Sequence, residues 1–502
     1  MKQLTELSSW MALEKHSESL RSTSFNLLKK DSALRSTKMT FASQGISINF
    51  SKQCLDETAL DLLIDLAKER NIKEKIFSLM NGDKVNQSEN RPALHTALRT
   101  FKDKPIWVDS HDIIPDIFTT REQMRVISTK IRDGLWLGQS GRPIKDIVNI
   151  GIGGSDFGPR FCVDALDKYV TADLGFHFVS DADPQAFEST VAKLKPETTL
   201  FIISSKSFTT RETLFNAQKA IAWINNNQQL DKHFIAITAN VSKAKTLGFS
   251  NVLPIWDWVG GRYSLCSAIN LITCIAIGFE QFTQLLVGAN SMDEHFYSKD
   301  LHENMPVLMA LIGLWNINFL HISSLLLLVY ARQLEKLVPY IQQLDMESNG
   351  KSIDNSGRSV NYATGPLVWG GAGNQAQHGY YQLLCQGTHK IAADFISNDE
   401  YNNDLIGHFC DAKMRVLSNG IDPTDNSNGY IPGGMPISHI RLNSCSPFCL
   451  GALIALYEHK VYVQSVLWNI NSFDQPGVES AKRQTPAAST ANQTEQSHIE
   501  VS

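Results

Sequence analysis

The stretch DIVNIGIGGSDFGPR, from Asp146 to Arg160, indicates most clearly how this chain of 502 residues folds. Its first part, Ile147–Ile150, has the length and apolar composition of a short buried strand. Glycines and a serine follow at 151–155, and a helix start comes directly after them. This order predicts a strand, a tight turn and a helix, in which backbone N–H groups of the turn can bind an anion.

The glycines of this turn are not spaced as they are in nucleotide-binding loops. Gly151, Gly153 and Gly154 do not form the G-x-G-x-x-G of a dinucleotide site, and the loop lacks the Lys-Ser or Lys-Thr ending of a P-loop. Two interpretations stay open: an anion site of another kind, or a strand-to-helix turn that binds no ligand.

Short apolar runs and helix-length segments alternate on the C-terminal side of this stretch. The runs are Phe176–Val179, Leu200–Ile203 and Phe234–Ile237, and the segment Thr210–Ile224 has apolar residues at helical spacing. Such alternation favours a parallel sheet with helices on both faces.

The alternation returns in the last third of the chain. Leu367–Trp369, His389–Phe395 and Tyr462–Trp468 are candidate strands, Gly370–Gly373 is a candidate turn, and Gln375–Gln386 is a candidate helix. The sequence therefore predicts an α/β fold of two similar domains, each with a parallel sheet flanked by helices.

We expect four parts along the chain, which is too long for one ordinary core. Residues 1–110 have apolar residues at helical spacing and predict a helical N-terminal segment. The first α/β domain is expected at 111–285 and the second at 286–482. Residues 483–502 are rich in Ser, Thr, Gln and Ala, which predicts a disordered tail.

Composition and charge exclude several classes of protein. A net charge of -5 and a pI near 6.3 argue against a nucleic-acid-binding protein. The 8 cysteines form no C-x-x-C pair, which favours buried thiols in a reducing compartment over a zinc site. No apolar secretory signal is present at the start, so a cytoplasmic location is expected. The apolar region Met305–Tyr330 is interrupted by polar residues, which predicts buried core helices and no membrane span.

The segment SSKSFTTRET, Ser204 to Thr213, directly follows an expected strand. It gathers hydroxyl side chains and Lys206 at the start of a helix, where free N–H groups and the helix dipole attract anions. One hydroxyl group is enough to cap a helix. The excess of hydroxyl groups favours a phosphate-binding loop, with helix capping alone as the alternative.

Two charged residues in other segments are candidates for catalysis. Arg262 follows two glycines in WDWVGGRYS, residues 256–264, and can approach a ligand closely, although a surface role is the alternative. Glu347 lies in QQLDMESNGKS, residues 342–352, at the end of a helix-like run. The helix dipole disfavours a carboxylate there, which suits a general base, whereas a solvated glutamate is the plain alternative.

Two further segments hold candidates for proton transfer. His378 lies in NQAQHGYYQLLCQG, residues 374–387, and Lys482 lies in SFDQPGVESAK, residues 472–482. Both have glutamines nearby that can bond hydroxyl groups of a ligand. A structural histidine and a solvated lysine are the alternatives.

Together these segments resemble the glucose-6-phosphate isomerase family, also called the phosphoglucose isomerase family. Two long signatures carry the resemblance, VGGRYSLCSAINL at 259–271 and SVLWNINSFDQPGVESAK at 465–482. IGIGGSDFGP, SKSFTTRET, MESNGK and the histidine segment match further family blocks in the expected order. The resemblance runs from about Ser110 to Lys482.

The resemblance implies an enzyme that converts D-glucose 6-phosphate reversibly into D-fructose 6-phosphate, in glycolysis and gluconeogenesis. It also implies two sugar-isomerase (SIS) domains without a metal or organic cofactor. The expected assembly is a homodimer in which His378 of each subunit reaches into the site of the other.

The resemblance assigns a role to each candidate residue. Glu347 corresponds to the base that moves a proton between C2 and C1, and Arg262 to the cation beside the enediolate. His378 and Lys482 correspond to the pair that opens the sugar ring and transfers hydroxyl protons. The expected substrate contacts are Gly154, Ser155, Ser205, Lys206, Ser207, Thr210, Gln343 and Gln475.

The chain departs from the family pattern near His378 and Lys482. Ala376 precedes Gln377-His378 where a glycine is usual, Cys385 stands where many relatives have a histidine, and Pro476 replaces a common tryptophan. These changes affect the surroundings of the two proton-transfer candidates and remove neither of them.

Two alternatives to this function stay open from the sequence. An isomerase of the same kind can also accept mannose 6-phosphate, because the shape of the pocket decides the stereochemistry of one hydroxyl group. A non-catalytic sensor of sugar phosphates needs the hydroxyl-rich segment but not the whole proton-transfer set. If Glu347 is not the base, Glu212 is the next candidate.

Overall fold

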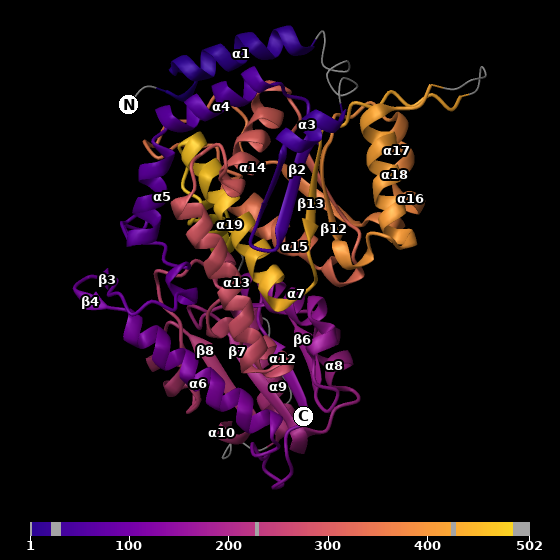
Figure 1. The fold of residues 1–502 in the computed structure, drawn as a ribbon. Coiled ribbons are helices and arrows are strands. Elements are labelled where there is room, and N and C mark those ends of the chain that lie inside the picture. The colour runs from indigo at the N-terminus through magenta and orange to yellow at the C-terminus, as the bar shows by residue number, and fades with distance from the viewer. Residues whose placement is uncertain (1–2, 22–31, 226–229, 423–427, 485–502) are drawn as a thin grey trace, which may run out of the picture.

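The computed structural model describes residues 3–21, 32–225, 230–422 and 428–484. Within these residues the chain forms two main sheets, each with helices on both faces, one above the other in Figure 1. The α/β fold with parallel sheets flanked by helices, predicted from the sequence, is confirmed.

The first sheet has five parallel strands in the order β6-β5-β7-β8-β9. The strands are β5 (Asp146–Ile150), β6 (Gly175–Val179), β7 (Thr199–Ser204), β8 (Phe234–Thr238) and β9 (Val252–Pro254). The first four match the predicted runs to within one residue at each end. The chain leaves β5 on one side and returns to β7 on the other, so a topological switch point lies between β5 and β7.

Alternate residues of these strands face different helices. In β5, Ile147 belongs to the core that includes α6 (Ile114–Arg132), α7 (Phe157–Ala165) and α12 (Leu271–Ile277). Val148 faces the other side, toward a second set of helices. That set is α8 (Pro184–Val191), α9 (Arg211–Ile224) and α11 (Val241–Thr246), and α10 (Leu230–His233) precedes β8. Burial on both faces is the reason why β5, β7 and β8 are mostly apolar runs in the sequence.

The second sheet has six strands in the order β1-β2-β13-β12-β10-β11. Four of them are parallel: β10 (Ser324–Val329), β11 (Leu367–Ala372), β12 (Ala392–Asn398) and β13 (Ile437–Leu442). Two strands from the N-terminal part extend this sheet, since β2 (Ile46–Lys52) pairs antiparallel with β13 and β1 (Thr40–Ser43) pairs antiparallel with β2.

The N-terminal part carries the expected helices in addition to these two strands, which were not predicted from the sequence. The helices are α1 (Ser8–Arg21), α3 (Ser32–Lys38), α4 (Glu57–Glu69) and α5 (Ile72–Asn81). A short hairpin of β3 (Trp107–Val108) and β4 (His111–Asp112) projects at the left in Figure 1.

Two helix layers cover the second sheet. One layer is α16 (Gly373–Gly379), α17 (Tyr381–Gln386) and α18 (Leu405–Asn419), on the right in Figure 1. The other includes α14 (Met305–Leu314), α15 (Leu337–Ile341) and α19 (Pro447–Trp468), beside the long helix α13 (Phe279–Ser298). Gly288 of α13 and Gly451 of α19 let these two helices touch, because a Cβ at either position would lie 1.9 Å from a carbonyl oxygen of the other helix.

The prediction of a strand at Tyr462–Trp468 is wrong, because these residues end α19, a helix of 22 residues. Nearly every side chain of α19 is buried. Its apolar residues therefore lie around the whole helix and give no helical period in the sequence. The prediction of helices throughout Met305–Tyr330 is also wrong in part, since the apolar run after α14 and the turn at Trp315–Phe319 is strand β10.

The glycines at Gly370–Gly373 were predicted as a turn, but β11 continues through them to Ala372. Gly370 has φ +139, and a Cβ there would lie 2.0 Å from the carbonyl oxygen of Leu327 in β10. The glycine therefore permits close pairing of the two strands rather than a reversal of the chain. The single helix predicted at Gln375–Gln386 is two short helices, α16 and α17, and the strand predicted at His389–Phe395 begins only at Ala392.

Other predictions concern the boundaries between the four parts of the chain, the cysteines and membrane-spanning helices. We retain the division of the chain at 110, 285 and 482 as a proposal, in which α13 crosses the second boundary. The expected tail lies outside the described residues, except that Arg483 and Gln484 end α20 (Pro476–Gln484). All eight cysteines are buried and unpaired. Among the described helices, none combines the length and apolar composition that a membrane span requires.

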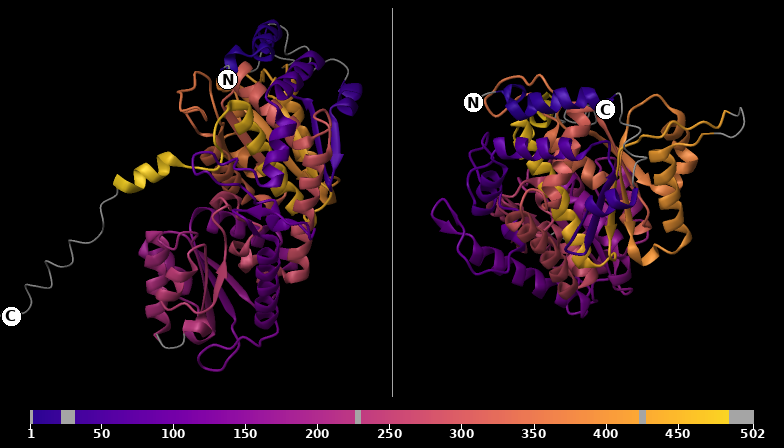
Figure 2. Two further views of the ribbon diagram at one scale, coloured as in Figure 1. Left: turned by 90° about the vertical axis from the view of Figure 1, so that its left-hand side faces the viewer. Right: turned by 45° about the horizontal axis from the view of Figure 1, so that its top comes forward.

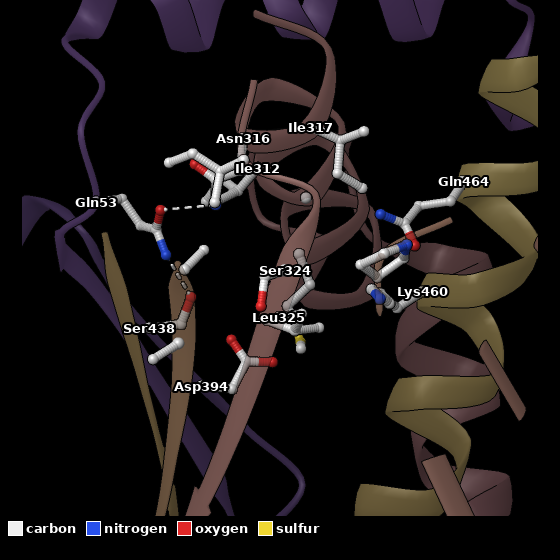
Figure 3. A pocket seen from close by; sticks show the side chains of 16 residues that line it. Gln53, Ile312, Asn316, Ile317, Ser324, Leu325, Asp394, Ser438, Lys460 and Gln464 are labelled. Carbon is white, nitrogen blue, oxygen red and sulfur yellow. Dashed lines mark hydrogen bonds between the residues drawn. The ribbon is translucent and has the colours of Figure 1, made fainter. Parts of the chain in front are cut away.

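A small buried cavity of about 30 Å³ lies at the start of β10, β12 and β13 (Figure 3). Gln53 donates a hydrogen bond to Ser438 and accepts one from Asn316 there. Burial raises the pKa of Asp394, which also lines the cavity, to about 6. This cavity is at the amino ends of the strands, whereas ligands of open α/β sheets bind outside the carboxyl ends.

Candidate active site

A second, much larger cavity of about 1120 Å³ lies at the carboxyl ends of β5, β7 and β8, next to the switch point of the first sheet. Every candidate residue from the sequence except His378 lines it. These residues are Gly154, Ser155, Ser205, Lys206, Ser207, Thr210, Arg262, Gln343, Glu347, Gln475 and Lys482. The fold thus brings together segments that are up to about 330 residues apart in the sequence.

Residues 204–210, named the hydroxyl loop here, connect β7 to the start of α9. The hydroxyl groups of Ser205 and Thr210 are 3.1 Å apart, and those of Ser207 and Thr209 are 2.7 Å apart. Phe208 has φ +53 and is fully buried, which anchors the loop in the core. Hydroxyl donors and the N-terminus of a 14-residue helix make this loop suitable for a phosphate group.

Lys206 of the hydroxyl loop points to the backbone of the next segment. Its ammonium group donates hydrogen bonds to the carbonyl oxygens of Asp257 and Val259, both at 2.9 Å. Burial lowers the pKa of Lys206. The lysine therefore ties the hydroxyl loop to the segment that leads into Arg262.

The glycine turn after β5 also contacts that segment. A Cβ on Gly154 would lie 2.0 Å from the carbonyl oxygen of Gly261, so only glycine permits this approach. Gly153 has φ +61 and lies against Gln343. The turn therefore has a structural reason for its glycines, in addition to any contact with a ligand.

Arg262 is 3% exposed and is held by contacts from two distant segments. Its Nε donates to Ser348 Oγ at 2.6 Å, and its Nη1 donates to Gln475 Oε1 at 2.9 Å. Its Nη2 donates to the carbonyl oxygens of Ser472 and Asp474, at 2.6 and 2.9 Å. We name Arg262 with residues 343–351 and 471–475 the arginine junction. The guanidinium group is fixed there at the edge of the cavity.

Glu347 lies at the end of a π-helical turn, Gln342–Glu347, that continues α15. Its Oε2 lies 3.3 Å from Arg262 Nη1 and accepts a hydrogen bond of 3.0 Å from Gln343 Nε2. The side chain is 23% exposed, so it can meet a molecule in the cavity. A carboxylate beside a fixed cation is the arrangement needed for proton abstraction next to a carbonyl group.

No group of three or more His, Cys, Asp or Glu side chains that could hold a metal ion occurs among the residues that the structure describes.

Comparisons with known proteins agree with this geometry. The family model for phosphoglucose isomerase matches residues 49–501. The glucose-6-phosphate isomerase of Legionella pneumophila (strain Paris) is 56% identical over 485 residues, which cover 96% of this chain and 97% of the relative. The chain belongs to the phosphoglucose isomerase family.

More distant members show the same relationship. Glucose-6-phosphate isomerase 1 of Chromohalobacter salexigens is 42% identical over 496 residues, covering 96% of this chain and 90% of the relative. The crystal structure of a glucose-6-phosphate isomerase from Chlamydia trachomatis superimposes with a TM-score of 0.88 at 29% identity, covering 96% of this chain and 95% of that chain. The phosphoglucose isomerase fold therefore extends over almost the whole molecule.

Two of the residues expected from this family differ from the others in their surroundings. His378 is on the exposed side of α16 and is not among the residues that line the cavity. Lys482 lines the cavity from α20, which projects from the body of the molecule in Figure 2. The Lys482 ammonium group lies 3.3 Å from Glu479 and is largely exposed.

The three residues that depart from the family pattern lie in the core or at the start of a helix. Ala376 and Cys385 are buried in the core between α16–α18 and the second sheet. Pro476 is the first residue of α20, a position in which its missing N–H costs nothing. None of the three lines the large cavity.

Several residues that hold the site together are not among those predicted from the sequence. Asn149 is fully buried in β5; it donates to the carbonyl oxygen of Ser155 and accepts from Ser204 Oγ, so it links the glycine turn to the hydroxyl loop. Lys351 lies in the arginine junction. A polar residue inside an otherwise apolar strand, and a lysine inside the MESNGK block, were the signals in the sequence.

Proposed function

We propose that this chain converts D-glucose 6-phosphate reversibly into D-fructose 6-phosphate by ring opening and base-catalysed proton transfer through an enediolate. The observation that carries the proposal is the Glu347–Arg262 pair, 3.3 Å apart in the cavity that also contains the hydroxyl loop. The curated relatives are named glucose-6-phosphate isomerases, which supports the same reaction.

The hydroxyl loop binds the phosphate group of the sugar. Ser205, Ser207 and Thr210 donate hydrogen bonds to the phosphate oxygens, together with N–H groups at the start of α9. Lys206 adds positive charge from behind the loop. Because the phosphate is remote from the reacting carbons, its binding energy serves to orient the sugar.

The sugar chain then lies toward the arginine junction. Gly154 and Ser155 contact it from the glycine turn, and Gln343 and Gln475 bond its hydroxyl groups. In the open-chain form, Glu347 removes the proton from C2 next to the C1 carbonyl and returns it to C1. The proton of the C2 hydroxyl group passes to the C1 oxygen, so that C2 becomes the carbonyl carbon.

Arg262 stabilises the negative charge of the enediolate. Its guanidinium group is already held by Ser348, Gln475 and two carbonyl oxygens, so it does not have to reorganise during the reaction. The proposed chemistry uses no metal ion and no organic cofactor.

Ring opening is assigned to His378 and Lys482, which transfer protons at the ring oxygen and the C1 hydroxyl group. We propose a homodimer, in which the partner subunit's His378 completes each site. The exposed position of His378, outside the cavity of its own chain, supports this arrangement. We also propose that the dimer works in the cytoplasm, in glycolysis and gluconeogenesis, where eight buried unpaired thiols would stay reduced.

Mixed dimers test the shared site. His378→Ala and Glu347→Gln chains are each expected to be inactive alone. When the two are unfolded together and refolded, each mixed dimer regains one complete site, and random pairing restores about a quarter of the wild-type activity. If the mixture stays as inactive as the separate variants, His378 does not act across the interface.

The assay that tests the function is formation of fructose 6-phosphate from glucose 6-phosphate by the purified chain in EDTA. Steady turnover supports the isomerase. If the chain binds the substrate without turnover, it is a sugar-phosphate sensor or acts on another epimer, and mannose 6-phosphate is the next substrate to assay. Absence of binding contradicts the phosphate site itself.

A further inference from the structure

The ammonium group of Lys351 lies at a crowded point of the arginine junction. Its three N–H groups are shared among four carbonyl oxygens within hydrogen-bonding distance, those of Glu347 (3.3 Å), Ser348 (2.8 Å), Asn471 (2.8 Å) and Asp474 (3.0 Å). The Asp474 carboxylate completes its surroundings, with Oδ1 at 3.2 Å. The lysine side chain is only 11% exposed.

These contacts join two segments that carry the proposed chemistry. Glu347 and Ser348 belong to the end of the helix that presents the general base. Asn471 and Asp474 belong to the segment whose carbonyl oxygens hold Arg262. The two cations share one acceptor, because the carbonyl oxygen of Asp474 accepts from both Lys351 and Arg262.

The Asp474 side chain is itself held in place. Its Oδ2 accepts hydrogen bonds from Ser88 Oγ and from Asn471 Nδ2, at 2.5 and 3.1 Å. Lys351 therefore binds to fixed acceptors on both sides of the junction. A buried ammonium group is costly unless acceptors surround it, and here the helix end and the 471–474 segment both have to be in place to supply them.

We propose that Lys351 is a positioning residue that clamps the helix end bearing Glu347 to the segment that holds Arg262. It fixes the distance between the base and the cation. It does not line the cavity, so it does not touch the substrate. This inference rests on the proposed function for its effect on catalysis, while the clamp itself is a property of the folded chain.

Lys351→Met is the first test, because methionine keeps the volume of the stem and removes the charge and the donors. A small misplacement of catalytic groups costs about 100-fold in rate, so kcat is expected to fall about 100-fold. The hydroxyl loop lies in the other part of the cavity, so KM for fructose 6-phosphate is expected to change less than about threefold. Lys351→Arg keeps a cation with several donors but replaces the compact ammonium group by a planar one, so it is expected to recover part of kcat.

Lys52→Met is the matched control. Lys52 is a partly buried lysine on β2 that donates to Ser418 Oγ at 3.1 Å, and it does not line the cavity. Its kcat and KM are expected to equal those of the wild type. Equal thermal stability of Lys351→Met and Lys52→Met would separate the loss of rate from a general loss of folding.

Amide hydrogen exchange tests the clamp without any catalysis. The Phe473 N–H donates to Asn471 Oδ1 at 3.0 Å, inside the clamped segment. Its exchange is expected to be faster in Lys351→Met than in the wild type, and unchanged in Lys52→Met. If the wild-type chain has no isomerase activity, the proposed function fails, and this measurement still decides whether the clamp exists.

Two results would overturn the inference. One is Phe473 exchange in Lys351→Met at the wild-type rate. The other is a kcat within about twofold of the wild type, since a positioning residue must change the rate. If Lys351→Met does not fold, Asp474→Asn tests the same clamp, because it removes the ion pair and leaves all the carbonyl acceptors in place. Asp474→Asn is expected to speed exchange of the Phe473 N–H and to lower kcat at least about threefold. Unchanged exchange and kcat in this variant contradict the inference.

Discussion

The hydroxyl loop and the arginine junction line the same cavity but are built in different ways. The hydroxyl loop is one continuous segment of seven residues, whose polar groups contact one another and the start of α9. The arginine junction is assembled from three segments, around 262, 343–351 and 471–475, and its cations are buried. The comparison teaches that the proposed phosphate site is built mainly from one local segment, whereas the proposed catalytic pair depends on segments that meet only in the tertiary structure.

This difference predicts that changes in the junction lower kcat and that changes in the loop raise KM. The largest effect is expected for Glu347→Gln, which keeps the size of the side chain but removes the base. General base catalysis contributes up to about 10⁴-fold, so kcat should fall by about 10³-fold to 10⁴-fold, measured by fructose 6-phosphate formation. Binding of fructose 6-phosphate, measured by calorimetry, should be nearly unchanged.

Glu212, which also lines the cavity near the hydroxyl loop, provides the control. Glu212→Gln should keep kcat within about tenfold of the wild type. The reverse outcome, an active Glu347→Gln and an inactive Glu212→Gln, would move the base from the junction to the loop.

Arg262→Lys should give the next largest effect. Lysine keeps the charge but cannot make the contacts of the guanidinium group to Ser348, Gln475 and two carbonyl oxygens at once. Loss of a fixed group beside a developing oxyanion costs about 10²-fold to 10³-fold in kcat. Steady-state kinetics at saturating substrate measure this effect, and a change confined to KM would assign Arg262 to binding.

In the hydroxyl loop, Ser207→Ala and Thr210→Val should mainly raise KM. A hydrogen bond to a charged group contributes about 1.5–3 kcal/mol, so each change should raise KM at least about tenfold and leave kcat within about threefold. Ser189→Ala, an exposed serine on α8, is the control. If Ser207→Ala or Thr210→Val lowers kcat as much as the junction variants do, the proposed division into a binding region and a catalytic region is wrong.

The smallest effect concerns pH. Burial and the nearby Arg262 lower the pKa of Lys351 to about 8, against the raising effect of Asp474 and Glu347. The lysine is therefore cationic below pH 8 and loses its proton, its ion pair and one donor as the pH rises through 8. We expect a fall in kcat of a few-fold with an apparent pKa of about 8, which Lys351→Arg should shift to higher pH. If the kcat of Lys351→Arg falls with the same apparent pKa as that of the wild type, another group causes the pH dependence.

The parts of the fold that could be predicted from the sequence are those with local signals. Strands β5, β7 and β8 are short runs buried on both faces, and α9 has one apolar face, so their patterns differ clearly. Helix α19 has neither signal, because burial on all sides removes the helical period. In β2, Ile46, Ile48 and Phe50 alternate with polar residues and are buried, so a signal for this strand was present and was overlooked.

The candidate site follows the same rule. Motifs and the family resemblance identified eleven of the residues that line the cavity. The roles of Asn149 and Lys351 could not be predicted from motifs, because they depend on carbonyl and hydroxyl groups of segments that meet only in the folded chain. The hydrogen bonds of Lys206 to Asp257 and Val259 were likewise invisible in a segment that indicated phosphate binding.

Turnover of glucose 6-phosphate labelled with deuterium at C2, in light water, tests the central claim most directly. If Glu347 removes the C2 hydrogen and returns it to C1, the first fructose 6-phosphate formed should retain deuterium at C1 in part of the molecules. The remainder should carry hydrogen from solvent, because a carboxyl group that is 23% exposed can exchange. Mass spectrometry of the product measures the ratio. Complete retention in every molecule would contradict proton transfer by a carboxyl group that exchanges with solvent, as the 23% exposed Glu347 is expected to do.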